Sequence, residues 1–137
     1  FLLIITLQTM AGIALSVFVS SATADRDREG LLVTLVTTIN ILFSGTMLPR
    51  PRIPAAIRWL HYAAFTYFAN VAYNQNEYNG RMVVGTGGLS GTGTAYLAEA
   101  GLHDMGLWMA VGGLLIHIFG ALLFGMLSVE LLWMRNP

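Results

Sequence analysis

Residues 105–129 read MGLWMAVGGLLIHIFGALLFGMLSV, a run of 25 residues without Asp, Glu, Lys or Arg. A helix needs about 20 mainly apolar residues to cross the hydrocarbon core of a bilayer. Two further runs without charged residues cover residues 1–24 and 30–49. We therefore expect an all-α membrane protein with three transmembrane helices, over residues 1–24, 30–48 and 105–133.

The composition excludes most classes of soluble protein. Of the 137 residues, 55% are hydrophobic and only 10% are charged, against roughly 25% charged in an ordinary globular domain. The seven Lys and Arg residues balance the seven Asp and Glu residues, so the chain lacks the basic excess of a protein that binds nucleic acid. It contains no cysteine, which excludes disulfides, a thiolate zinc site and a cysteine nucleophile.

The sequence begins at Phe1, already inside an apolar run. It shows no basic amino-terminal region and no small-residue cleavage site, so we do not expect a signal peptide. We expect instead a fragment that begins within a membrane helix of a longer protein.

Five consecutive charged residues, 25–29, connect the first two expected spans. So short a connection makes these spans antiparallel neighbours. Three crossings place residues 25–29 and the carboxyl end on one side of the membrane, with three basic residues. Residues 50–103 then lie on the other side with four basic residues, and the positive-inside rule favours that side as cytoplasmic by one charge.

Residues 54–75 are expected to form a helix that lies in the interface, or that enters the membrane and returns. The second span ends at Pro49, because proline lacks the amide donor that a helix interior requires. Apolar residues then recur at steps of three and four, as in an amphipathic helix, at Ile57, Leu60, Ala64, Phe68 and Val71. The aromatic residues of the types that prefer the headgroup level are Trp59, Tyr62, Tyr67 and Tyr73.

Residues 76–104 are expected to be a polar loop outside the membrane, with a short helix near residues 95–100. The glycines after Val84 have neither the preceding strand nor the Lys-Ser/Thr pair of a phosphate-binding loop. The sequence has no recognisable pairing of a nucleophile with a base, and no pair of carboxylates at a fixed spacing. We therefore expect no catalytic residue and no metal site in this chain.

Polar residues inside the expected spans are the candidates for function. Thr34, Thr38 and Ile41 form one stripe of the second span, which also contains Asn40. In hydrocarbon such groups face protein or a water-filled cavity, although a threonine hydroxyl also bonds its own helix backbone. These polar residues of the second span therefore either pack against another helix or line a cavity. His117 lies at the middle of the third span, where an ionisable residue is either functional or hydrogen-bonded to a neighbouring helix.

Several local motifs follow one another in a specific order. A threonine-rich helix ending Phe43-Ser44-Gly45 comes first. The motifs after it are Ile53-Pro54, Trp59-Leu60-His61-Tyr62, Asn76-Glu77-Tyr78, Tyr96-Leu97 and Gly106-Leu107-Trp108. This ordered set resembles the carboxyl-terminal half of the membrane domain of the G-family (White-type) ATP-binding-cassette transporters, and the resemblance covers nearly all of the chain.

The resemblance implies that the three spans are helices four, five and six of a six-helix domain. Residues 25–29 would then be cytoplasmic and residues 49–104 a large extracellular or lumenal loop, against the one-charge preference above. A nucleotide-binding domain, which holds ATP and Mg, would precede the membrane domain and would be absent from this fragment. Two half-transporters would form a homodimer or heterodimer in the plasma membrane or in an organelle membrane.

In this family the fifth helix lines the substrate cavity near the twofold axis of the dimer. The positions that match are Leu31, Thr34, Leu35, Thr38 and Ile41. Multidrug members place two leucines after Phe-Ser-Gly as a hydrophobic plug, whereas Thr46 and Met47 stand there in this chain. The resemblance implies an exporter of lipids, sterols or amphipathic xenobiotics, with Asn40 and His117 as possible polar contacts.

Two other functions fit the sequence. The first is a membrane haem protein or a quinone-linked subunit that uses His117. His61 is a poor second haem ligand, because by helical rise it lies about 15 Å nearer the membrane surface than His117. The second is an accessory membrane subunit without a transport path, in which the threonines and a ridge of small residues at Gly12, Ser16 and Ser20 only pack helices.

Overall fold

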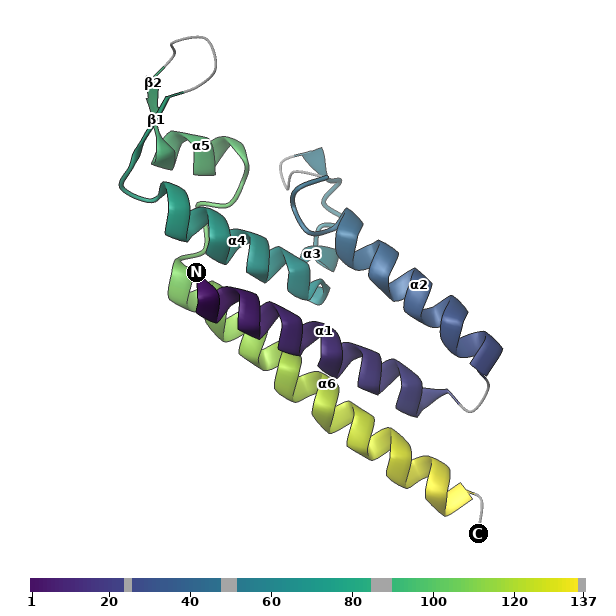
Figure 1. The fold of residues 1–137 in the computed structure, drawn as a ribbon. Helices are drawn as coiled ribbons and strands as arrows, with labels where there is room; N and C mark the ends of the chain where they lie inside the picture. The colour runs from purple at the N-terminus through teal and green to yellow at the C-terminus, as the bar shows by residue number, and fades with distance from the viewer. Residues whose placement is uncertain (24–25, 48–51, 85–89, 136–137) are drawn as a thin grey trace.

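The computed structural model describes residues 1–23, 26–47, 52–84 and 90–135. Its elements in chain order are α1 (Leu2–Ala22), α2 (Arg26–Leu42), α3 (Leu60–Ala63), α4 (Phe65–Tyr78), β1 (Met82–Val84), β2 (Ser90–Thr92), α5 (Gly93–Glu99) and α6 (Leu107–Arg135). Figure 1 shows α1 and α6 side by side, with α4 beside both at the end where the chain begins. The second helix, α2, runs back antiparallel to α1, as the short connection predicts, but stands away from the α1–α6 pair.

The α1–α6 pair is the main packing unit of the molecule. The buried residues on α1 include Ala11 and Ala14, and those on α6 include Ala110 and Leu114. Small side chains allow two helix backbones to approach closely, which is how helices gain packing energy in a bilayer. Gly12 and Ser16, from the ridge of small residues, line a groove towards α2 and α4 instead.

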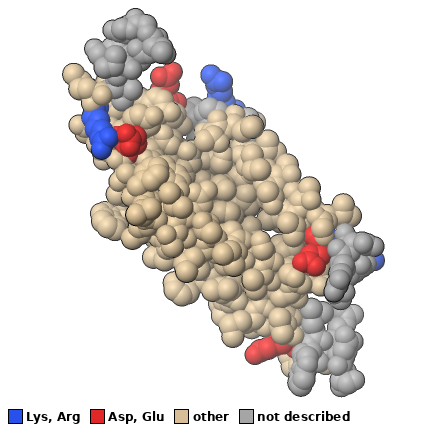
Figure 2. All heavy atoms as spheres, viewed as in Figure 1, with Lys and Arg blue, Asp and Glu red and all other residues tan. Residues whose placement is uncertain are grey.

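Two helices of the described residues are long and apolar enough to cross a membrane, α1 over Leu2–Ala22 and α6 over Leu107–Leu131. Both expose large apolar side chains, among them Ile116, Phe119 and Phe124. Figure 2 shows charged side chains at the two ends of the face in view and none over its middle. An apolar band between charged ends is the pattern of a membrane protein, because hydrocarbon solvates no charge.

The expected second span differs in its bounds from the helix observed there. The helix α2 begins at Arg26, so most of the charged connection forms its first turn, and it ends at Leu42. An acidic residue such as Glu29 is favourable in the first turn of a helix. The helix has 17 residues, which rise about 26 Å. The end expected at residue 48, before Pro49, lies outside the described residues.

The segment expected to form one interfacial helix is broken in two. Ala64 has extended backbone angles, φ −94° and ψ 110°, and separates α3 from α4. Trp59 and Tyr62 are exposed, and Tyr73 is half-buried. The expectation for Tyr67 was wrong, because this side chain is 1% exposed and lies in the core. Its ring stacks on the imidazole of His61, with centroids 4.9 Å apart, a tertiary contact that periodicity could not reveal.

Residues after α4 form a small polar cap that contains more structure than the expected loop. The strands β1 and β2 pair as an antiparallel hairpin, and α5 occupies nearly the place expected for a short helix. The Gly93 amide donates to the Arg81 carbonyl oxygen at 2.8 Å, and the Gln75 side chain donates to the Leu102 carbonyl oxygen at 3.0 Å. The first bond closes the base of the hairpin, and the second ties the segment after α5 to α4.

A glycine allows α4 to pack on α6. A Cβ atom built at Gly113 would lie 2.2 Å from Cδ1 of Phe68. The Phe68 ring cannot move aside easily, because it also contacts the rings of Tyr67 and His117, at centroid distances of 5.7 Å and 5.1 Å. The neighbouring Gly112 has no such contact, since nothing lies within 4 Å of its built Cβ.

We predict that Gly113→Ala destabilises the protein by about 1–3 kcal/mol, the usual cost of overpacking a filled interface. The measurement is the free energy of unfolding in a denaturant titration of the detergent-solubilised protein. Gly112→Ala is the matched control and should leave stability unchanged or slightly increased. Equal stability of the two variants would contradict the close contact between Phe68 and Gly113.

Candidate functional site

The end of α2 carries the residues expected to form a gate. The last helical turn tightens, with the Ser44 amide donating to the Ile41 carbonyl oxygen at 3.4 Å. Gly45 then adopts φ +87°, a left-handed conformation that commonly ends helices and that glycine adopts without steric cost. A Cβ at Gly45 would also lie 3.3 Å from Nδ2 of Asn70. Glycine is therefore required here both by its backbone angle and by its surroundings.

Side chains from α3 and α4 bind the carbonyl groups at the end of α2. The Asn70 amide donates to the Ser44 carbonyl oxygen at 3.1 Å, and Nδ1 of His61 lies 3.1 Å from the Phe43 carbonyl oxygen. The Thr66 hydroxyl donates to the Asn40 carbonyl oxygen. The last carbonyls of a helix have no partner within the helix. These three bonds fix the end of α2 against α4.

The predicted cavity stripe lies on the outer face of α2. Leu31 is 74%, Leu35 55% and Ile41 49% exposed, and Thr34 and Thr38 are exposed as well. Both threonine hydroxyls donate to their own helix at 2.8 Å, to the carbonyl oxygens of Gly30 and Thr34. The structure therefore brings the five predicted residues onto one face. The hydroxyl protons of the two threonines are already used in bonds to the helix backbone.

The predicted gate residues follow the Gly45 turn. Thr46 and Met47 are both exposed, and the hydroxyl oxygens of Thr46 and Ser44 lie 2.6 Å apart. The hydroxyl of Ser44 is thus held between the Ile41 carbonyl oxygen and Thr46. This bonding holds Thr46 at the tip of α2, next to the cavity stripe.

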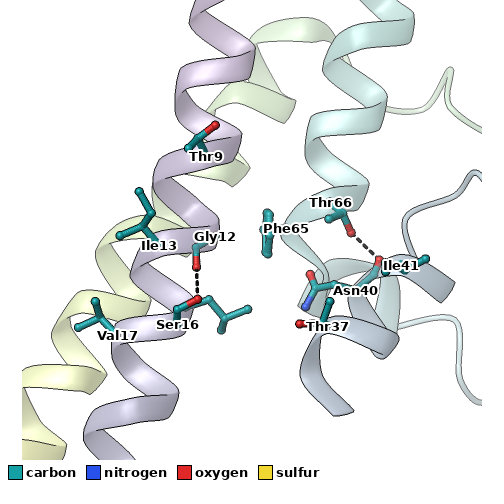
Figure 3. A pocket seen from close by; sticks show the side chains of 11 residues that line it. Thr9, Gly12, Ile13, Ser16, Val17, Thr37, Asn40, Ile41, Phe65 and Thr66 are labelled. Carbon is teal, nitrogen blue, oxygen red and sulfur yellow. Dashed lines mark hydrogen bonds between the residues drawn. The ribbon is translucent and has the colours of Figure 1, made fainter. Parts of the chain in front are cut away.

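A groove of about 480 Å³ lies between α1, α2 and α4. Asn40, a predicted polar contact, lies in its wall and is 5% exposed. Figure 3 shows the residues that face the groove, which include Thr9, Gly12 and Ser16 from α1, Thr37 and Ile41 from α2, and Phe65 and Thr66 from α4. The sequence did not reveal this grouping. The ridge of small residues that includes Gly12 and Ser16 is the feature that could have marked the α1 side.

His117 lies in a second, smaller pocket of about 240 Å³ between α1, α4 and α6, lined mainly by apolar residues. Its Nδ1 lies 2.9 Å from the Gly113 carbonyl oxygen, one turn earlier in its own helix. A row of ring contacts through Phe68 and Tyr67 joins it to His61. In the part of the chain that the structure describes, no group of three or more His, Cys, Asp or Glu side chains could hold a metal ion.

The comparison with protein families settles the broad class of the chain. The family model described as ABC-2 type transporter matches residues 1–78, which is more than half of the 137 residues. The chain belongs to the ABC-2 type transporter family. A comparison with curated proteins gives no match. As a membrane domain of this family, the chain is a membrane transport component of an ABC exporter and is not itself catalytic.

The bonds at the end of α2 lie within the part of the chain that matches the ABC-2 type transporter family. The matched range includes the whole of α2, α3 and α4. Membrane domains of this family work with nucleotide-binding ATPase components. Thr46 and Met47 follow directly on the end of α2, which is bonded to α4 through Asn70 and the Ser44 carbonyl oxygen.

We predict that Gly45→Ala destabilises this ABC-2 type membrane domain by about 1–2 kcal/mol, because a side chain at a left-handed position is strained. The measurement is the free energy of unfolding in mixed micelles. Gly30→Ala is the matched control at the other end of α2, where nothing lies within 4 Å of the built Cβ, and it should stabilise by about 0.5–1 kcal/mol. A loss of stability in the control alone would contradict the assignment.

Proposed function

We propose that the chain is the membrane-spanning part of a G-family exporter that moves lipids, sterols or amphipathic xenobiotics across the bilayer. The observation that supports this function is the exposed face of α2, which combines apolar side chains with threonines. Binding sites for hydrophobic molecules have mainly apolar walls with a few polar groups that orient the ligand. This face matches that description and has no partner among the described elements.

The central slot of the proposed exporter forms between two such faces, one from each of two half-transporters. In this arrangement α2 crosses the membrane in addition to α1 and α6, and it stands between α1 and the dimer axis. Its splayed position leaves Leu31 and Leu35 unpacked. In hydrocarbon a helix face that carries threonines is expected to face protein or a water-filled cavity, which supports this position for α2.

The proposed mechanism uses ATP-driven closure of the nucleotide-binding domains to narrow the slot. Alternating access requires that the two states differ in affinity for the cargo. Narrowing the slot brings Leu35 and Thr38 of the two copies closer and expels the ligand toward Thr46 and Met47. The Gly45 turn, bonded to Asn70 through the Ser44 carbonyl group, keeps this constriction attached to α4.

The order of motifs supports the narrower G-family assignment within the ABC-2 type transporters. The Phe43-Ser44-Gly45 motif forms the end of α2, and the Trp59-Leu60-His61-Tyr62 motif leads into α3. The two motifs are bonded to each other through His61 and the Phe43 carbonyl group. This contact gives a structural reason for the two motifs to occur together in one family, which supports the use of their order as a family signature.

We predict that Thr38→Trp abolishes transport of an amphipathic fluorescent substrate into inside-out vesicles, because the indole fills the slot. Leu123→Trp, at a 58% exposed position on α6, is the matched control and should transport as the wild type does. Dimer assembly, measured by size-exclusion chromatography, should be the same for both variants. Normal transport by Thr38→Trp would reject the cavity assignment.

We also predict that single cysteines at positions 34 and 38 react with a water-soluble maleimide in intact membranes. The chain contains no native cysteine, so each variant carries one thiol in this chain. A cysteine at Leu123 faces lipid and should stay unreacted, because a thiol in hydrocarbon is not ionised and not reached by the reagent. Equal inertness at all three positions would favour an accessory subunit without a transport path.

A further inference from the structure

Asn40 carries an acceptor that the fold leaves without a partner. Its Nδ2 donates to the Val36 carbonyl oxygen at 3.0 Å, which fixes the amide orientation, since the flipped amide would oppose two oxygens. Its Oδ1 is buried and has no hydrogen-bond partner in the described residues. Burying a polar atom without a partner costs free energy, and more so in an apolar environment. A donor from outside the described chain is therefore expected at this atom.

The groove beside Asn40 offers further acceptors. The hydroxyls of Thr9 and Ser16 donate at 2.9 Å to carbonyl oxygens of their own helix, those of Ile5 and Gly12. Their protons are thus already used, and their oxygen lone pairs are the groups left for a ligand. Figure 3 shows the side chains of Asn40 and Thr37 on the α2 wall, directed toward the groove. The groove therefore suits a ligand that donates a hydrogen bond.

We propose that the groove between α1, α2 and α4 binds a neutral amphiphile whose hydroxyl group donates a hydrogen bond to Oδ1 of Asn40. Its volume of about 480 Å³ lies within the range of small-molecule sites, about 300–1,000 Å³. None of the described residues that line it is charged, so it offers no counter-ion to a charged headgroup. Apolar side chains such as Ile13, Val17 and Phe65 cover the remaining surface.

This site is separate from the slot of the proposed exporter. At 3.6 residues per turn, Asn40 lies on the far side of α2 from Leu31 and Leu35. The slot stripe consists of exposed side chains, whereas the groove contains the buried side chain of Asn40 with its unpartnered acceptor. Only Ile41 belongs to both faces. The groove proposal goes beyond the proposed function and does not depend on it.

The test uses the protein reconstituted in lipid nanodiscs and two photoreactive probes, a long-chain alcohol carrying a diazirine and the methyl ether of the same alcohol. Mass spectrometry locates the labelled peptides. The alcohol should label residues of the groove about two- to tenfold more than the ether, the effect of one net hydrogen bond. In Asn40→Leu this preference should disappear, because the acceptor is lost.

A second variant fills the groove without changing the acceptor of Asn40, so it tests whether the ligand occupies this volume. A Cβ at Gly12 would meet Cζ of Phe65 at 3.8 Å, an ordinary contact, so Gly12→Leu is tolerated by the backbone and directs its side chain into the groove. It should remove labelling by both probes. Gly112→Leu is the matched control on α6 and should label as the wild type does.

Two results would overturn the proposal. One is equal labelling of the groove by the alcohol and the ether in the wild type, which would mean that no hydroxyl is recognised. The other is absence of label from the groove residues, which would mean that water or another helix fills the space. Thr38→Trp should leave the labelling unchanged while it blocks transport, so failure of the slot and failure of the groove are told apart.

Discussion

The unpaired carbonyl groups at the end of α2 are the constraint on which the arrangement of this half of the molecule depends. A bilayer core offers no water to such groups, so protein must bond them. Thr66, His61 and Asn70 do so for the carbonyl oxygens of Asn40, Phe43 and Ser44. Because α2 stands away from α1, these bonds to α3 and α4 determine where its tip lies.

The same bonds explain why the segment after α2 is not one straight helix. His61 reaches the Phe43 carbonyl group from α3, while Thr66 and Asn70 reach α2 from α4. The extended residue Ala64 separates these two helices. Periodicity in residues 54–75 predicted the apolar face but not the break, since Ala64 fits an amphipathic helix as well as it fits a bend. Only the bonding needs of a distant segment select the bend.

The long helices were predictable from the sequence, whereas the faces they present were not. Uncharged runs gave α1 and α6 nearly to their ends, because length and hydropathy alone decide a membrane crossing. For α2, helical spacing grouped Thr34, Thr38 and Ile41, the family resemblance added Leu31 and Leu35, and all five are exposed. The position of Asn40 in the groove depends on α1 and α4 lying beside α2. A single sequence does not show which helices are neighbours. The core position of Tyr67 was missed for the same reason.

The close contact between the ring of Phe68 and the backbone of Gly113 limits how α4 can move along α6. If α4 slid along α6 by one helical turn, the ring would meet the side chain of Met109 or His117 where it now meets a bare backbone. Close-packed helix surfaces of this kind fit together only in particular registers, so the helices do not slide past each other gradually. The contact therefore holds α4 and α6 in register, whereas α2, which stands away from α1, is less constrained.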